Sequence, residues 1–197
     1  MKRIFDIFVS SLAIILFLPI FLIISLLIAI DSKGDILYSQ TRVGKNNIDF
    51  SLLKFRTMRM DSDNNGLLTI GNKDSRITRV GYYLRKSKID EFPQLINIIK
   101  GEMSIVGPRP EVRKYVNMYN ETQKQVLSVR PGLTDYASLT YINESEMLAR
   151  EKEPEKAYIA KIMPHKIEMN LQYIQNHTLL DDFKIIYKTI NLLSKKR

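Results

Sequence analysis

The sequence contains no cysteine and no tryptophan, and only two histidines, His165 and His177. Without cysteine the chain forms no disulfide, no thiolate metal site and no cysteine nucleophile. A serine hydrolase triad would need one of the histidines, and neither lies in a motif that suggests a triad. The groups left for nucleophilic or general-base chemistry are therefore carboxylates.

Positive charge exceeds negative charge, with 30 Lys and Arg against 21 Asp and Glu and a net charge of +9. This balance indicates an anionic partner, and nucleic acid, a phosphorylated substrate and a membrane surface all meet that description. The 197 residues are enough for one domain with a sizeable core.

No charged residue occurs between Ile7 and Ile30. A helix of this run would be about 36 Å long, enough to cross a hydrocarbon core of about 30 Å. The run is too long for a cleaved signal peptide, and no A-x-A-like site follows it. The sequence therefore predicts a membrane anchor.

Pro19 leaves two interpretations of this anchor open. Proline removes a backbone donor and collides with the carbonyl of Ile15, and each remaining arm of about 18 Å would only reach the midplane. Lysine and arginine flank the run on both sides, which satisfies the positive-inside rule at both ends only if both ends stay in the cytoplasm. The alternative is a kinked spanning helix, because membrane helices tolerate proline.

Downstream, the pattern alternates between short extended and helical segments. Residues 35–44 and 48–58 alternate apolar and polar side chains around a Gly-Lys-Asn-Asn turn, which predicts a β-hairpin. Residues 61–76 are polar and predict a loop, and residues 77–84 a short helix. Apolar side chains then recur at helical spacing, at Phe92, Leu95, Ile96 and Ile99.

In the second half, residues 111–129 suggest another helix, and residues 130–141 suggest a return to short extended structure. Residues from Glu151 onward predict helices, the first interrupted by Pro164. These last helices mix lysine with tyrosine and leucine. They fit two interpretations, amphipathic helices on an anionic membrane surface or helices that face a protein core.

Asp61-Ser62-Asp63 matches the D-x-D pattern with which many nucleotide-sugar glycosyltransferases hold a divalent metal. The same stretch imitates the start of an EF-hand loop, but position twelve would be Asn72 instead of glutamate. Such a short pattern is common in polar loops, so we interpret it as part of a solvated loop.

Asp90 and Glu91 precede Pro93, which fits only the first turn of a helix, so both acids are expected near a helix N-terminus. The helix dipole there keeps a carboxylate ionised and favours phosphate. An ionised Asp can act as a nucleophile, and the neighbouring Glu can hold Mg²⁺ or take a proton. Helix capping is the alternative explanation for both acids.

Arg109 lies between two prolines in the sequence GPRP. The prolines fix φ on both sides and remove two donors, which predicts a rigid arm. A rigid guanidinium suits phosphate recognition, although a stiff loop with a surface salt bridge would also explain it.

The motifs KFRTM, LRKSKIDEFPQLINIIKGEMSIVGPRP and VRPGLT follow one N-terminal apolar segment in this order. Together they resemble the bacterial sugar transferase family, in the minimal form of its monotopic phosphoglycosyl transferases. The resemblance covers nearly the whole chain. It implies transfer of a sugar 1-phosphate from a UDP-sugar to undecaprenyl phosphate, which initiates the synthesis of a glycan.

The resemblance also implies roles for the matching residues. Asp90 would attack the β-phosphate and form a phosphosugar-enzyme intermediate with release of UMP. Glu91 would hold the metal or deprotonate the acceptor, and Mg²⁺ would bridge Asp90 and the diphosphate. The residues expected to bind the phosphates or the nucleotide are Lys54, Arg56, Arg85 and Arg109.

Two departures from the family pattern are visible. The family's N-terminal helix is re-entrant and breaks at a proline that usually follows serine, whereas Leu18 precedes Pro19 here. The family often continues PGLTGWAQ, whereas this chain has PGLTDYAS, which introduces Asp135 and Tyr136. The second departure affects the expected selectivity for sugar or nucleotide.

Taken together, the sequence predicts an α/β-mixed, helix-rich fold with a helix-break-helix anchor in residues 1–31. Residues 32–197 would form a membrane-associated catalytic domain on the cytoplasmic face of the bacterial inner membrane. The expected partners are a UDP-sugar, undecaprenyl phosphate and inner-membrane lipids, without nucleic acid; homo-oligomerisation is left open. The competing hypotheses are a conventional glycosyltransferase that uses Asp61 and Asp63 and releases UDP, and a membrane-tethered binder of nucleic acid or anionic lipid.

Overall fold

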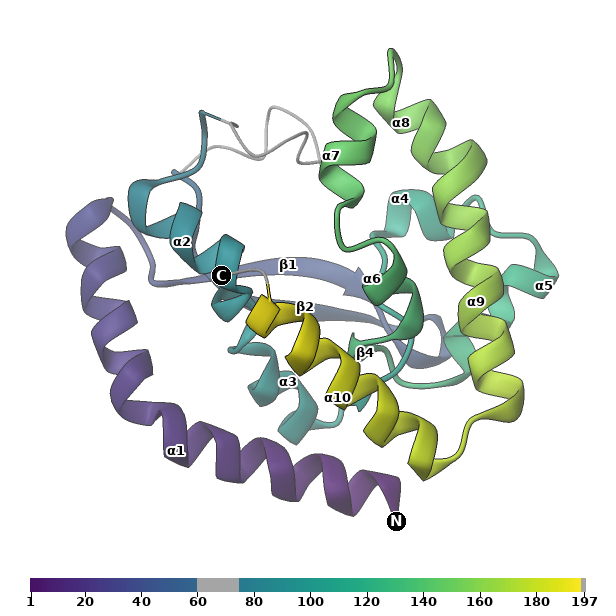
Figure 1. Ribbon diagram of the computed structural model, residues 1–197, viewed down its shortest axis with the longest axis horizontal. Coiled ribbons are helices and arrows are strands. Elements are labelled where there is room, and N and C mark those ends of the chain that lie inside the picture. Colours follow the sequence, from purple (N-terminus) through teal and green to yellow (C-terminus); the bar gives the residue numbers. More distant parts are fainter. Residues whose placement is uncertain (60–74, 196–197) are drawn as a thin grey trace.

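The computed structural model describes residues 1–59 and 75–195, and Figure 1 shows how their elements are arranged. A β-hairpin lies in the middle of the molecule, and helices surround it. The fold is helix-rich and mixed α/β, as predicted. The Asp61-Ser62-Asp63 motif and most of the predicted polar loop lie outside the described residues.

The hairpin consists of two antiparallel strands, β1 (Leu37–Val43) and β2 (Asp49–Phe55), paired along their whole length. In the turn, Asn46 and Asn47 have φ values of 57° and 64°. Asparagine enters this left-handed region more readily than most residues. The hairpin and its asparagine turn are therefore confirmed.

A second, very short sheet joins two segments that are distant in sequence. Strands β3 (Ser104–Val106) and β4 (Gly132–Thr134) pair in parallel. A Cβ atom on Gly132 would lie 2.1 Å from the backbone nitrogen of Gly107. Only glycine allows this close approach of the two backbones, which fixes the GPRP segment beside the PGLT segment.

The N-terminal apolar run forms one helix, α1 (Lys2–Asp31), which continues through Pro19 and bends partway along (Figure 1), so the predicted break in the anchor is a bend. Pro19 has no N–H to donate to the carbonyl of Ile15, and such a missing bond is a common cause of a kink. Around the proline, the rings of Phe17 and Phe21 pack on Phe92, with centroids 5.6 Å and 6.0 Å apart.

Polar contacts fasten the first turns of α1 to the rest of the protein. Arg3 donates from Nη1 to the carbonyl of Ile98 at 2.6 Å. Asp6 is buried, and its carboxylate accepts from Ser104 Oγ at 2.8 Å and from the backbone N–H of Ile105 at 3.2 Å. Such buried charged contacts fix the position of the helix start.

The end of α1 also forms hydrogen bonds with the rest of the protein. Asp31 accepts a hydrogen bond from the backbone N–H of Val80 at 2.9 Å. Arg56 donates from Nη2 to the carbonyl of Ser32 at 2.6 Å. Both ends of the apolar helix therefore contact one compact structure.

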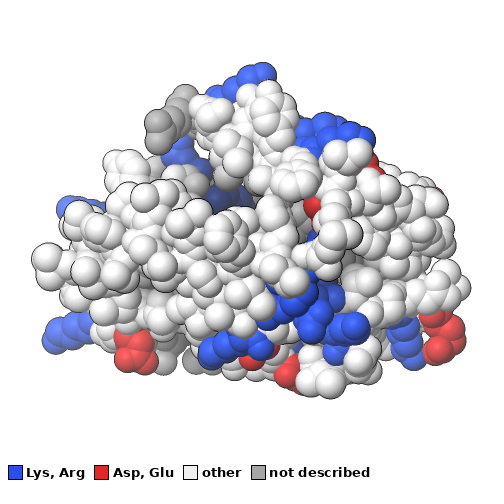
Figure 2. Space-filling view, turned by 90° about the horizontal axis from the view of Figure 1, so that it is seen from below, with Lys and Arg blue, Asp and Glu red and all other residues white. Residues whose placement is uncertain are grey.

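Between its ends, α1 is exposed and apolar. By length and composition it could cross a membrane, and only 11% of its most apolar 18-residue window is buried. In the last helix, α10 (Leu179–Lys195), an outward stripe at helical spacing is also exposed, at Leu180, Phe183, Tyr187 and Ile190. Figure 2 shows the face formed along the lower edge of Figure 1 as broad and largely uncharged.

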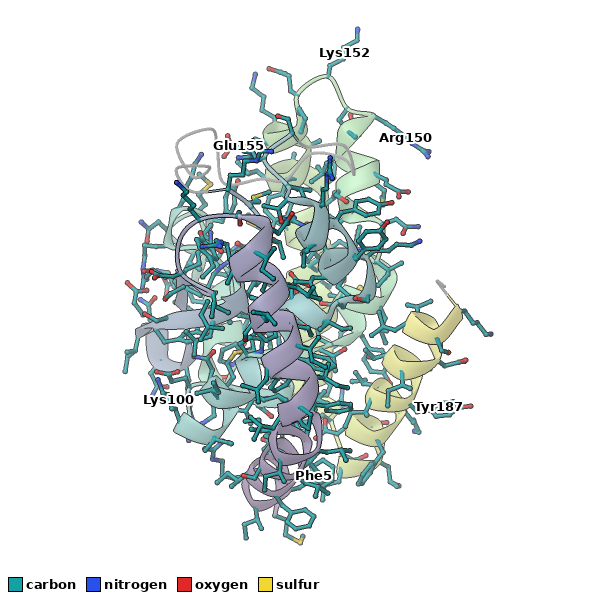
Figure 3. All side chains as sticks on the ribbon, turned by 90° about the vertical axis from the view of Figure 1, so that its left-hand side faces the viewer. Phe5, Lys100, Arg150, Lys152, Glu155 and Tyr187 are labelled. Carbon is teal, nitrogen blue, oxygen red and sulfur yellow. The ribbon has the colours of Figure 1, made fainter. Side chains whose placement is uncertain are left out.

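The segment around Lys152 lies far from the start of α1 (Figure 3). Figure 3 shows Phe5 at one end of the molecule and Arg150, Lys152 and Glu155 at the other, with Tyr187 directed away from α10. The rings of Phe5 and Phe183 meet edge to face at 5.2 Å, so α1 and α10 lie side by side there.

Short helices make up most of the remainder. In chain order they are α2 (Arg79–Ser87), α3 (Gln94–Lys100), α4 (Arg113–Val116), α5 (Glu121–Lys124), α6 (Tyr136–Thr140), α7 (Glu144–Ala149), α8 (Pro154–Ala157) and α9 (Met163–Asn176). Short 3₁₀ or π segments are η1 (Lys45–Asn47), η3 (Ile89–Glu91), η4 (Gln125–Ser128) and η5 (Tyr158–Ile162).

Three sequence-based expectations about these helices were wrong in detail. The single helix expected for residues 111–129 is divided into α4, α5 and η4. The segment 130–141 is extended only in β4 and then forms α6. The expected interruption at Pro164 is a change of helix type and not a gap, because the π segment η5 ends at Ile162 and α9 begins at Met163. The wider π turn tolerates the donor that proline lacks.

The buried face of α3 also differs from the expected stripe. Leu95 and Ile98 are buried, at 8% and 0% exposure, whereas Ile96 and Ile99 are 37% and 38% exposed. The polar neighbour Asn97 is buried too, because its side chain binds the backbone of β2 at Ser51 and Leu53. Asn97 can be buried on the core face of α3 because its polar atoms have backbone partners.

Candidate active site

Asp90 and Glu91 lie in the 3₁₀ turn η3, between α2 and α3. Helix α2 ends at Lys88 in the left-handed conformation, with φ 59°, and Pro93 is the N-cap of α3. The chain therefore reverses tightly around the two acids, and both are 7% exposed. Their predicted position before a helix is confirmed, and their burial requires charged or polar partners.

Two bases from distant segments pair with Glu91. Arg109 donates from Nη1 to Oε2 at 3.2 Å and from Nη2 to Oε1. Lys54 of β2 places Nζ 3.5 Å from Oε1. Burial alone would raise the pKa of Glu91, but the charges of Arg109 and Lys54 outweigh it and hold that pKa well below its usual range.

Asp90 has a different environment. Burial, followed by the negative charge of Glu91, raises the pKa of Asp90, while Lys54, Lys88 and Arg85 oppose the rise. Its Oδ1 atom is buried and has no hydrogen-bond partner among the described residues. The paired acid is thus Glu91, and Asp90 has one carboxylate oxygen without a hydrogen-bond partner among the described residues.

Lys54 is itself perturbed. Burial lowers the pKa of Lys54 to about 8, against the opposing charge of Glu91. An ammonium group with such a pKa changes charge close to physiological pH.

The sequence comparisons identify the family of the chain. The model of the bacterial sugar transferase family matches residues 1–196. The chain belongs to this family.

Three relatives illustrate the match. The chain is 36% identical over 195 residues to a UDP-N-acetylgalactosamine-undecaprenyl-phosphate N-acetylgalactosaminephosphotransferase from Aeromonas hydrophila, covering 98% of this chain but 43% of that protein. It is 35% identical over 204 residues to the exopolysaccharide production protein ExoY of Rhizobium meliloti, covering 96% of this chain and 83% of that protein. It is 33% identical over 192 residues to a UDP-glucose:undecaprenyl-phosphate glucose-1-phosphate transferase of Caulobacter vibrioides, with coverages of 96% and 68%. This sugar transferase thus spans less than half of the first relative and most of the other two.

The rigid GPRP arm of the transferase has a partner that the sequence did not indicate. The backbone N–H of Arg109 donates to Asp135 Oδ2 at 3.0 Å, and Asp135 Oδ1 accepts from the N–H of Ser138, so that it also caps α6. Asp135 is 1% exposed. In the sequence, only the departure from the family pattern singles out Asp135. That departure predicts a change in selectivity, and not a contact that supports Arg109.

The four bases that were expected to bind phosphate do not all lie near Asp90 and Glu91. Lys54 and Arg109 meet at Glu91, and Arg85 is close enough for its charge to lower the pKa of Asp90. Arg56 is instead buried against the end of α1, where it binds the carbonyl of Ser32. Its Nε and Nη1 atoms are buried without a hydrogen-bond partner among the described residues.

The transferase offers few ligands for a metal ion. Within residues 1–59 and 75–195, no three His, Cys, Asp or Glu side chains lie close enough together to hold one. Asp90 and Glu91 remain as a pair, with one unpartnered oxygen on Asp90. Because Mg²⁺ is commonly held by one or two carboxylates together with water and substrate phosphates, this donor set fits Mg²⁺ bound with a diphosphate.

Proposed function

We propose that this protein transfers a sugar 1-phosphate from a UDP-sugar to undecaprenyl phosphate through a covalent intermediate on Asp90. The observation that carries the proposal is the buried Asp90 with its unpartnered Oδ1, surrounded by the charges of Lys54, Arg85 and Lys88. The names of the relatives from Aeromonas and Caulobacter, which act on undecaprenyl phosphate, support the same substrate class.

In the first step, a carboxylate oxygen of Asp90 attacks the β-phosphorus of the UDP-sugar. A phosphorus–oxygen bond forms to Asp90, and the bond from the β-phosphorus to the bridging oxygen breaks. The electron pair leaves with the bridging oxygen on UMP. The sugar phosphate remains on the enzyme as an acyl phosphate, as in other aspartyl-phosphate chemistry.

In the second step, a phosphate oxygen of undecaprenyl phosphate attacks the same phosphorus. Asp90 leaves as a free carboxylate, and the product is undecaprenyl diphosphate sugar. Two steps let UMP depart before the second anionic substrate arrives, so that the two phosphate-bearing molecules never crowd the site together. The product would begin the assembly of a glycan.

The neighbouring bases have distinct tasks in this scheme. Arg109 and Lys54 hold Glu91 ionised and extend positive charge toward the diphosphate. Arg85 and Lys88 favour the ionised form of Asp90, which the attack requires. Arg56 joins β2 to the end of α1 and acts as a positioning residue.

Asp90 and Glu91 are the residues that would hold Mg²⁺. When bound, the ion supplies charge neutralisation for the diphosphate.

The contacts at both ends of α1 support a re-entrant anchor. A straight helix of these 30 residues would be about 45 Å long and would leave its ends on opposite sides of the bilayer. Here Arg3 and Asp31 both bind the same compact structure, on α3 and α2 respectively. We therefore place both ends of α1 and residues 32–197 on the cytoplasmic face of the inner membrane, where UDP-sugars are available.

The exposed stripe of α10 would lie at the membrane surface beside α1. Phe183 and Tyr187 belong to this stripe, and their amphipathic or aromatic rings suit the interface between headgroups and acyl chains. The charged turn around Lys152 would then face away from the membrane (Figure 3).

The decisive experiment is incubation of the purified full-length protein with Mg²⁺ and a UDP-sugar labelled in the sugar and in the β-phosphate, without lipid acceptor. We expect label on the protein, in the peptide that contains Asp90, together with one UMP per label. Release of UDP with no labelled protein would identify a conventional glycosyltransferase instead. Label on another residue would refute the role of Asp90.

A further inference from the structure

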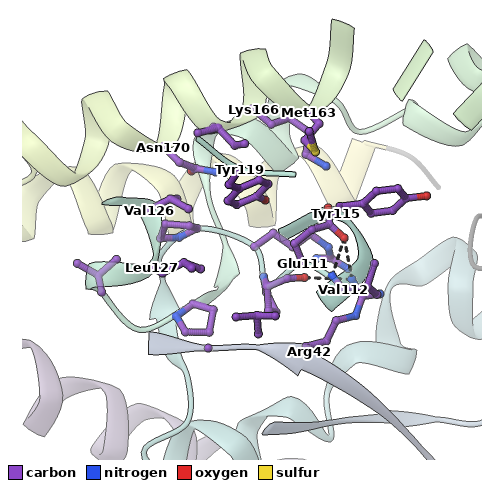
Figure 4. A pocket seen from close by; sticks show the side chains of 18 of the residues that line it. Arg42, Glu111, Val112, Tyr115, Tyr119, Val126, Leu127, Met163, Lys166 and Asn170 are labelled. Carbon is purple, nitrogen blue, oxygen red and sulfur yellow. Dashed lines mark hydrogen bonds and ion pairs between the residues drawn. The ribbon is translucent and has the colours of Figure 1, made fainter. Parts of the chain in front are cut away.

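A cavity of about 160 Å³ is lined by Arg109 but not by Asp90 or Glu91. Its walls come from β1, the GPRP segment, α4, η4, α7, η5 and α9, and Figure 4 shows it from close by. Arg42 and Glu111 line one side, whereas Tyr119 and Asn170 line the side formed by the helices. It is smaller than the range of about 300–1,000 Å³ that is typical for whole drug-sized ligands, so it suits one ring of a larger substrate.

The polar groups of the cavity include an acceptor that lacks a partner. Asn170 is 5% exposed, and its Oδ1 atom is buried with no hydrogen-bond partner among the described residues. Buried amide oxygens normally accept a hydrogen bond. An amide oxygen without a partner in a cavity wall therefore indicates a ligand that carries a hydrogen-bond donor. Tyr119 adds an aromatic ring and a hydroxyl to the same wall.

The charges in the wall are already paired. Arg42 Nη1 lies 3.4 Å from Glu111 Oε1, and Lys166 Nζ lies 2.7 Å from Glu144 Oε2. Tyr158 donates a further hydrogen bond to Glu111. With its bases neutralised by its own carboxylates, the cavity suits an uncharged polar ligand better than a phosphate.

Arg109 connects the cavity to the reacting centre. Arg109 lines the cavity, and its guanidinium also binds Glu91, the residue next to Asp90. Arg42 holds this segment in place by donating to the carbonyl of Pro110 at 3.1 Å. A phosphate held by Arg109 beside Asp90 would therefore bring its substituent close to the cavity that Arg109 also lines.

We propose that this cavity is the subsite for the hexose ring of the UDP-sugar, and that Asn170 and Tyr119 determine which sugar is accepted. The proposal rests on the proposed function. The hexose is joined to the β-phosphorus by one oxygen, so it lies next to Asp90 in any productive arrangement. It also stays on the enzyme after UMP leaves, so a cavity beside Arg109 can hold it during both steps.

The test measures binding, so that it does not depend on turnover. Full-length Asp90→Asn protein, which cannot form the intermediate, is titrated calorimetrically with UDP alone. The same protein is titrated with UDP-glucose, UDP-galactose and the two corresponding N-acetylhexosamine donors. Asn170→Leu and Tyr119→Phe are then introduced in this background, because both keep the approximate volume and remove the polar group. The control is Gln172→Leu, an exposed amide on the same helix α9.

We expect Asn170→Leu to weaken the preferred UDP-sugar by about tenfold or more, the range for loss of a buried hydrogen bond. The affinity for UDP should change less than about twofold. Because the preferred donor loses a hydrogen bond, the differences in affinity among the four UDP-sugars should become smaller. Tyr119→Phe should give a smaller effect of the same kind, and Gln172→Leu none.

Two results would overturn the proposal. Equal weakening of UDP and UDP-sugar would mean that the cavity holds the nucleoside, and unchanged binding of every donor in both variants would mean that it holds no part of the donor. Failure of the proposed function is separate, because it is seen as absence of UMP and of labelled protein with the wild type. If Asn170→Leu does not fold, as judged by its circular dichroism, the decision rests on Tyr119→Phe.

Discussion

Arg109 donates to both carboxylate oxygens of Glu91, the immediate neighbour of Asp90. This contact divides one acid pair into two unlike groups. Glu91 has its pKa lowered and its oxygens occupied, whereas Asp90 has its pKa raised and one oxygen unpartnered. Opposite environments for two adjacent acids are a common way of assigning them different tasks.

The two acids should therefore respond in opposite ways to loss of charge. Asp90→Asn should abolish transfer while the thermal midpoint stays equal to or above that of the wild type, because a poorly compensated buried charge is removed. Glu91→Gln should also impair turnover, but it should destabilise the fold by about 1–3 kcal/mol because Arg109 and Lys54 lose their partner. Differential scanning calorimetry in detergent, combined with a UMP-release assay, measures both. A lower midpoint for Asp90→Asn than for Glu91→Gln would contradict this assignment.

The dependence of kcat/KM on pH should show a fall on the alkaline side near pH 8. Lys54 is charged below its pKa of about 8 and neutral above it, so the site loses positive charge as the pH rises through that value. Lys54→Arg keeps the charge at all accessible pH values and should shift the fall to higher pH. The profile is measured at saturating Mg²⁺, and Lys54→Met serves as the uncharged control. An identical alkaline limb in Lys54→Arg would show that another group titrates there.

As the pH is lowered, the loss of activity should occur at a pH above the ordinary pKa of an aspartate. Asp90 must be ionised to attack, and burial together with Glu91 raises its pKa. Activity therefore increases as the pH rises through this raised value. If kcat/KM instead falls at the ordinary carboxyl pKa, the pKa of Asp90 is not raised in the working enzyme.

Asp135 should act on turnover through Arg109. Asp135→Ala removes both the acceptor for the N–H of Arg109 and the cap of α6, which costs about 1 kcal/mol as a cap. We expect a fall in kcat/KM of about tenfold or more, with Asp135→Asn closer to the wild type because it retains an acceptor oxygen. Steady-state kinetics with a UDP-sugar gives the comparison. A purely structural role would instead lower the thermal midpoint in both variants without separating their kcat/KM values.

The path of α1 is accessible to single-cysteine labelling, because the natural chain has no cysteine. Lys2→Cys and Lys33→Cys report on the two ends of the helix, and both should resist an impermeant thiol reagent in intact cells but react after lysis. A spanning helix would expose one of them to the periplasm. Pro19→Leu should restore the missing backbone donor and move part of the population toward spanning; unchanged labelling of Lys2→Cys in that background would show that the proline does not set the path.

Local sequence determined the elements whose cause is local. The alternation of β1 and β2 and the Asn46-Asn47 turn specified the hairpin, and Pro93 specified a helix start directly after Asp90 and Glu91. Local pattern failed where the cause was distant. Asn97 entered the core face of α3 because β2 supplies its backbone partners, and Arg56 lies at the end of α1 because Ser32 accepts from it there.

The sequence by itself determined the family, the apolar anchor and the acid pair, because each is written in residues that are adjacent in the chain. Tertiary structure decided what these residues do to one another. It brought Arg109 from beyond β3 and Lys54 from β2 onto the same carboxylate, it set Asp135 behind Arg109, and it formed a cavity from segments that are distant in the sequence. Charge interactions and burial depend on distances in space, and only the packed fold fixes those distances.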